Sequence, residues 1–139
     1  MSKAALQASN NNVQSVVNGS QISVGSINLR FGRDICVNEG SIVFKSCGYY
    51  MIDCSVTAQP EAIGEVAVKL QHNGVDIPGA TTFGYASAAD QNVTMKLSAM
   101  IRVTTNNSCP CQNLPDTLSC VLVDGAGDVV GVMTDVVKL

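Results

Sequence analysis

The chain has 139 residues and a formal net charge of −3, with 46% hydrophobic and only 14% charged residues. This length is typical of one domain, and the hydrophobic fraction is enough to form a core. The weak negative charge argues against binding to nucleic acid or anionic lipid. The sequence contains one histidine and no tryptophan, which excludes most histidine-based catalysis and most imidazole metal sites. We therefore expect a protein that is not an enzyme and needs no cofactor.

The N-terminal residues 1–25 are polar and rich in Asn and Ser. Two interpretations are compatible with this composition: an arm that docks on a neighbour such as a capsid or fibre protein, or a frayed end followed by an ordinary first strand. Residues 26–139 then form a single domain. Residues 1–10 lack the apolar stretch of a secretory signal, and no segment reaches the roughly eighteen apolar residues of a membrane span. We expect synthesis in the cytoplasm without a signal peptide, and no membrane insertion.

The composition favours strands, because β-branched residues are abundant and Glu and Lys are scarce. Short strand candidates lie at 21–24, 27–30 and 41–45. The strongest signal is the alternation over residues 48–58, which predicts a long strand with Tyr50 and the other even-numbered residues facing the core.

The next segment predicts a β-hairpin. Val66, Val68 and Leu70 alternate with polar residues, and Asn73-Gly74 follows. Asn-Gly supplies the two positive φ values of a type I′ turn. Residues 75–77 would form the returning strand and end at Pro78.

Three further strands complete the domain. Residues 92–103 alternate again, residues 104–115 form a polar loop with Cys and Pro, and strands at 117–124 and 128–138 close the chain. Eight to ten strands separated by frequent turns predict an all-β antiparallel sandwich or barrel without a helix.

Several apolar residues fall on faces that should meet water. The last strand is apolar on both faces, which an antiparallel sheet with one wet face should not be. Either this strand is covered on both sides within the domain, or its outer face forms a subunit interface. We favour the interface, and the residues predicted for it are Tyr49, Val121, Val123, Val130, Val132 and Met133.

The six cysteines divide into two groups. Alternation places Cys54 and Cys120 in the core, where a thiol behaves as a small hydrophobe. The other four lie in or beside loops: Cys36, Cys47, Cys109 and Cys111. Their spacing does not match a zinc ribbon or knuckle, so they form either reduced structural thiols or a disulfide from the 109–111 region to Cys36 or Cys47.

Candidates for catalysis or metal binding are few. His72 is the one partner available to a Ser or Cys nucleophile, but its position beside a hairpin turn predicts a solvated side chain. Hard oxygen ligands for calcium occur at Asp124, Asp128 and Asp135, although we predict no metal. Turn aspartates more often bond to the backbone.

The middle of the chain resembles the TNF-like jelly roll. The residues that carry the resemblance are Gly48-Tyr49-Tyr50-Met51-Ile52, then Val66 to Gly74 and Ile77-Pro78-Gly79. The family includes the globular heads of complement and of bacterial collagen-like proteins. The resemblance covers residues 42–139 and implies a homotrimer with edge and C-terminal strands at its axis. The family's usual turn before the penultimate strand, with the sequence A-G-D or similar, is replaced here by the Cys-rich segment 107–116.

Small jelly rolls of this kind are also similar to phage and prophage virion proteins, such as head fibres, capsid decoration proteins and tail-tip domains. The sequence thus predicts a structural protein of a virion or particle surface that trimerises and attaches multivalently to a host-surface glycan or protein. One alternative is a lectin-like module that uses loop carboxylates, with or without calcium. Another is an enzyme with a cysteine nucleophile, which requires one thiol of low pKa.

Overall fold

The computed structural model describes residues 3–104 and 116–139 and places them in twelve strands. In chain order these are β1 (Ala5–Asn10), β2 (Gln14–Val16), β3 (Gln21–Ile22), β4 (Ser26–Phe31), β5 (Ile35–Asn38), β6 (Ser41–Phe44), β7 (Gly48–Pro60), β8 (Gly64–His72), β9 (Val75–Ala86), β10 (Val93–Val103), β11 (Asp116–Asp124) and β12 (Gly127–Lys138). Within these described residues there is no helix that could cross a bilayer.

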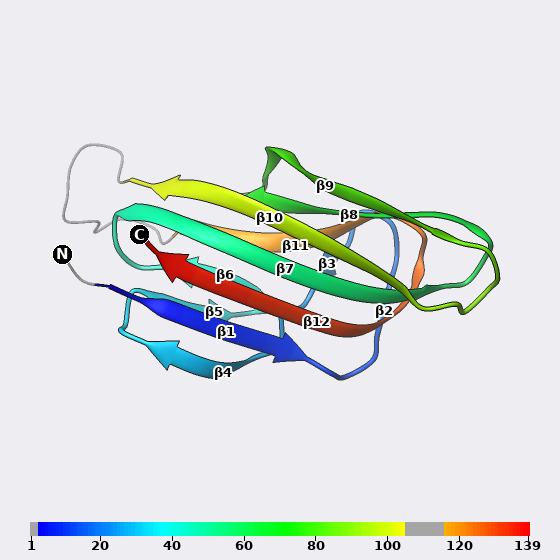
Figure 1. The fold of residues 1–139 in the computed structure, drawn as a ribbon, viewed down its shortest axis with the longest axis horizontal. Coiled ribbons are helices and arrows are strands. Elements are labelled where there is room, and N and C mark those ends of the chain that lie inside the picture. Colours follow the sequence, from blue (N-terminus) through cyan, green and yellow to red (C-terminus); the bar gives the residue numbers. More distant parts are fainter. Residues whose placement is uncertain (1–2, 105–115) are drawn as a thin grey trace.

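The strands form two antiparallel sheets that pack face to face (Figure 1). The first sheet has the order β10-β7-β12-β1-β4, with β2 also paired to β12. The second sheet has the order β5-β6-β11-β8-β9, with β3 paired to β11. The core lies between the two inner faces, where alternate residues of each strand meet. The predicted all-β antiparallel sandwich is confirmed.

Strand β7 shows why alternation was informative here. The even-numbered residues from Tyr50 to Val56 are buried, while the odd-numbered residues between them are more exposed. The Tyr50 ring lies 4.6 Å from the Phe44 ring, and its hydroxyl donates to the carbonyl oxygen of Ser46 at 2.9 Å. A buried phenol needs such a partner. Burial raises the pKa of Tyr50.

The hairpin between β8 and β9 is confirmed, with φ values of 54° at Asn73 and 80° at Gly74. The predicted end of the returning strand at Pro78 is wrong, because β9 continues to Ala86. Among the described residues, strand β9 is the last strand of its sheet and pairs only with β8. At an edge, a proline without an N–H removes no ladder bond, and the pairing skips residues 77–80 through a register shift.

The N-terminal segment belongs to the sandwich. Strand β1 lies between β12 and β4, and its Leu6 and Ala8 side chains are 3% and 0% exposed. Strands β2 and β3 pair with β12 and β11. From residue 5 to residue 22 the chain therefore contributes strands to both sheets, which corrects the interpretation of this stretch as an extended docking arm.

Two glycines allow a matched test of the turn before β4. Gly25 and Gly19 have φ values of +86° and +87°, so alanine carries a similar backbone strain at both. A Cβ at Gly25 would overlap the carbonyl oxygen of Ser9, whereas at Gly19 nothing lies within 4 Å. We expect Gly25→Ala to destabilise the chain by about 1–3 kcal/mol more than Gly19→Ala. Thermal melts followed by circular dichroism measure the difference, and equal melting temperatures would contradict it.

Candidate self-association face

The outer face of the first sheet carries large exposed apolar side chains from four of its strands. Their exposed fractions run from 41% to 68%. They are Leu29, Phe31, Tyr49, Met51, Met100, Met133 and Val137. A wet outer face of an antiparallel sheet is normally polar, and contiguous exposed apolar groups of this kind mark an interaction surface.

The strand register aligns five of the outward residues in one row across the whole sheet. The row runs Phe31, Ala5, Val137, Met51 and Met100, from β4 through β1, β12 and β7 to β10. Neighbours in such a row are close enough for their side chains to touch. This apolar row spans the first sheet from one edge to the other.

The adjacent row is polar at its centre. Asp135 of β12 and Asp53 of β7 are directly opposite each other. Gln7 Nε2 donates to Asp135 Oδ1 at 2.9 Å, and Ser98 Oγ donates to Asp53 Oδ1 at 2.7 Å. The face thus combines an apolar row with a pair of carboxylates.

Three of the predicted interface residues lie on β12, and they differ in how far their side chains are exposed. Met133 is 42% exposed on the outer face, and Val130 is half-buried. Val132 is 3% exposed in the core, so its predicted role at the interface is corrected. A register shift between Val129 and Gly131 is the cause: the extra residue of a bulge inverts the alternation, so Val129 and Val132 both face inward.

The two predicted residues of β11 lie in the other sheet. Val121 is 7% exposed and Val123 is 38% exposed. Because β11 belongs to the second sheet, these residues cannot join one surface with Tyr49, which is 49% exposed on β7. Alternation assigns residues to faces of a strand, but it does not say which strands share a sheet. The Leu29 and Phe31 contribution from β4 was missed for the same reason.

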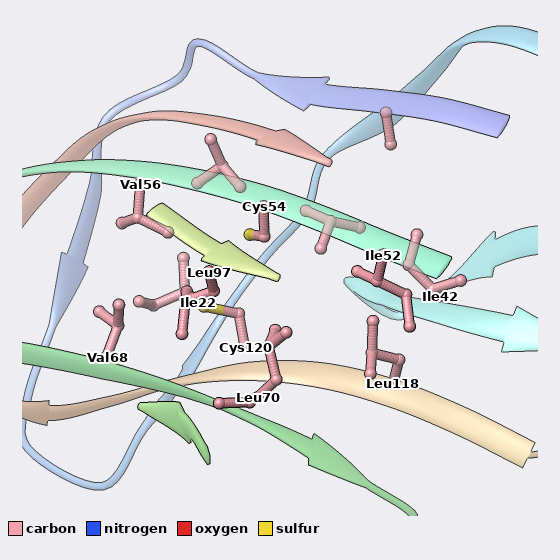
Figure 2. Packing of buried hydrophobic residues seen from close by; sticks show 14 of the residues in the cluster. Ile22, Ile42, Ile52, Cys54, Val56, Val68, Leu70, Leu97, Leu118 and Cys120 are labelled. Carbon is pink, nitrogen blue, oxygen red and sulfur yellow. The ribbon is translucent and has the colours of Figure 1, made fainter. Parts of the chain in front are cut away.

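The core thiols lie where alternation placed them, facing each other from β7 and β11 (Figure 2). Cys54 is 3% exposed and Cys120 is 1% exposed. The Cys120 thiol hydrogen-bonds to Cys54 and lowers its pKa, while the same contact and burial raise the pKa of Cys120. Thr134 Oγ1 also donates to Cys54 Sγ at 3.6 Å. Cys54 thus combines a lowered pKa with a buried side chain.

The loop cysteines have different states. Cys36 is a free thiol, and Cys47 is disulfide-bonded. Cys109 and Cys111 lie outside the described residues.

The predicted solvation of His72 is wrong. Its Nε2 lies 2.8 Å from Asp116 Oδ2, and both side chains are largely buried. His72 is the last residue of β8, next to the hairpin turn, which is why the sequence predicted a solvated side chain. The carboxylate that contacts it, Asp116, comes from the neighbouring strand β11.

The three calcium candidates do not meet. Asp124 Oδ1 accepts a bond from the backbone N–H of Gly125, as turn aspartates commonly do. Asp128 and Asp135 lie seven residues apart on β12, which is about 23 Å along an extended strand. No group of three metal-ligating side chains occurs in the described part of the chain.

No family model matches the chain, and no curated protein matches it in sequence. Solved structures match it in shape. Murine APRIL at pH 5.0 superposes with a TM-score of 0.69 at 14% identity, over 99% of this chain and 100% of that chain. The globular domain of zebrafish complement 1qA gives 0.63 at 12% identity, over 94% of each chain. The PRD1 vertex protein P5 gives 0.62 at 11% identity, over 97% of this chain and 95% of that chain.

These likenesses extend over nearly the whole of each chain. They agree with the sandwich of two antiparallel sheets and with the resemblance carried by the residues around β7 and the β8–β9 hairpin. At such low identity they concern the fold alone. The chain has a TNF-like jelly-roll fold.

Proposed function

We propose that this protein is a non-enzymatic structural module that forms a homotrimer through the outer face of its first sheet. The observation that carries the proposal is the apolar row from Phe31 to Met100, exposed on a sheet face that should otherwise be polar. Burying this row against another copy removes apolar surface from water, which is the main favourable contribution in most protein association.

The part of the second copy that meets this face is the β9 edge of the sandwich. Phe83 and Tyr85 of β9 are 61% and 65% exposed. An edge of one copy against the face of the next is a heterologous contact, which closes into a ring when the rotation permits. The resemblance to the TNF-like jelly roll implies three copies, with edge and C-terminal strands at the axis.

We place the trimer on a virion or another particle surface, where it attaches to a capsid or fibre protein or to a host-surface glycan or protein. The fold likeness to a vertex protein and to a complement globular domain supports this proposal. Three identical copies give avidity that one weak site lacks. The low content of charged residues fits an exterior covered by amides and hydroxyls.

Native molar mass by size exclusion with light scattering tests the trimer. We expect about three times the 14.5 kDa of the chain. Met51→Asp puts a charge within the apolar row and should yield a folded monomer. Ile63→Asp is the control, because Ile63 is 63% exposed in the turn between β7 and β8, and it should keep the parent mass. A parent protein that is monomeric at both acid and neutral pH, or a trimeric Met51→Asp variant, would refute the proposal.

A further inference from the structure

Two carboxylates lie directly opposite each other on the face proposed for self-association. Asp53 and Asp135 are paired in register on β7 and β12, which places their Cβ atoms about 5 Å apart on the same side of the sheet. Asp53 is exposed and Asp135 is half-buried. Like charges in directly opposed positions repel each other.

The side chains that donate hydrogen bonds to this pair are neutral. Ser98 donates to Asp53, and Gln7 donates to Asp135. Among the described residues, neither carboxylate has an ion-pair partner within 4 Å. Each carboxylate therefore depends on water for its remaining hydrogen bonds.

The charged groups around the pair come from three strands. On β10, Lys96 lines a shallow depression together with both aspartates, and Arg102 stacks over Tyr49 at 5.8 Å. On β4, Arg30 lines a second depression that the same two aspartates share. On β12, Lys138 forms an ion pair with Asp34, with 2.9 Å between Nζ and Oδ2. Strand β1 carries no charged residue.

Resting on the homotrimer proposed above, we propose that acid promotes self-association and that Asp53 and Asp135 are the groups responsible. Association removes the water that solvates the two charges, and an unpaired carboxylate is costly to bury. Protonation of one carboxyl removes the repulsion and creates a donor for the other, so the pair can share one proton. Ionised carboxylates oppose assembly at neutral pH, and proton uptake accompanies assembly.

The thermodynamic linkage between proton binding and assembly gives the size and direction of the pH effect on the association constant. Each proton taken up on assembly tightens the association constant about ten-fold for each pH unit that the pH falls. Since carboxyl groups titrate on the acid side of neutrality, we expect association at least about ten-fold tighter at about pH 5 than at about pH 7.5.

Sedimentation velocity over a dilution series at the two pH values is the test. The paired variant Asp53→Asn with Asp135→Asn keeps an amide oxygen to accept from Ser98 and Gln7. It should associate equally at both pH values, and as tightly at neutral pH as the parent does in acid. Melting temperatures confirm that each variant is folded.

A charge-matched control is needed because a protein near zero net charge associates nonspecifically. Glu39→Gln with Glu61→Gln removes the same two negative charges from exposed turn positions outside the face and outside the β9 edge. This variant should keep the pH dependence of the parent.

The outcomes separate the two proposals. A trimer whose association does not change with pH, or tightens as pH rises, would leave the proposed function standing and overturn the role of the aspartates. An asparagine variant that keeps the parent's pH dependence would overturn that role in the same way. A chain that stays monomeric at both pH values, in every variant, would overturn both proposals.

Discussion

Replacing Val132 by Asp is expected to destabilise the fold strongly, whereas the same change at the next residue, Met133, should change its stability little. Val132 is 3% exposed and lies opposite Val56, so an aspartate there would be an unpaired carboxylate in the core. We expect a loss of about 4 kcal/mol or more in the free energy of unfolding. That is a large part of the roughly 5–15 kcal/mol that stabilises an ordinary domain.

Met133 provides the matched control because it is 42% exposed on the outer face of the same strand. Met133→Asp should melt at the temperature of the parent protein diluted until it is monomeric. In light scattering, this variant should no longer form the trimer. Circular dichroism melts and native mass, measured on both variants, distinguish a folding defect from an assembly defect. A Val132→Asp variant that is monomeric but melts like Met133→Asp would mean that the bulge does not turn Val132 into the core.

The contrast between these two residues also shows how far the sequence reaches. Strands β7 and β10 were predictable because uninterrupted alternation spans most of each strand, and Tyr50 and Ile52 are buried as expected. In β12 the bulge between Val129 and Gly131 inverts the alternation. Val129 and Val132 therefore both lie on the inner face, while Met133 and Val137 lie on the outer face. No local residue pattern marks the position of the extra residue.

The interaction face was less predictable than the fold. The sequence identified Tyr49 and Met133, but the row that joins Phe31 to Met100 depends on pairing between strands far apart in the chain. Register across β1, β12 and β7 also brings Asp53 opposite Asp135. These juxtapositions are products of topology, which short-range periodicity does not encode.

The resemblance to the TNF-like family predicted part of the topology that short-range periodicity does not encode. Glycines, hydrophobic residues and the Asn-Gly turn around β7 and the β8–β9 hairpin predicted a TNF-like jelly roll, and the shape comparisons agree. The same motif could not predict that the N-terminal residues would insert β1 between β12 and β4. Strand β1 is short, and its two buried residues, Leu6 and Ala8, give too little alternation to distinguish a strand from an arm.

The ion pair between Lys138 and Asp34 is expected to contribute strongly to stability, because it attaches the end of the central strand β12 to the turn after β4. Lys138 Nζ lies 2.9 Å from Asp34 Oδ2, and its side chain is 8% exposed. The same ammonium donates to Ser46 Oγ at 2.9 Å. Lys138→Met keeps most of the apolar stem but removes the cation beside a largely buried carboxylate.

Removing one partner of a buried pair is costly, and we expect Lys138→Met to lower the free energy of unfolding by about 3 kcal/mol, or the melting temperature by about 10 °C. Lys69→Met is the control: Lys69 and Asp76 are 3.0 Å apart, but Asp76 is 60% exposed, and exposed pairs contribute little. Melts of the two variants against the parent provide the measurement. Equal, small shifts would mean that water screens the Lys138 pair as effectively as the surface pair. The cohesion of β12 with the β4–β5 turn would then come from backbone pairing and packing alone.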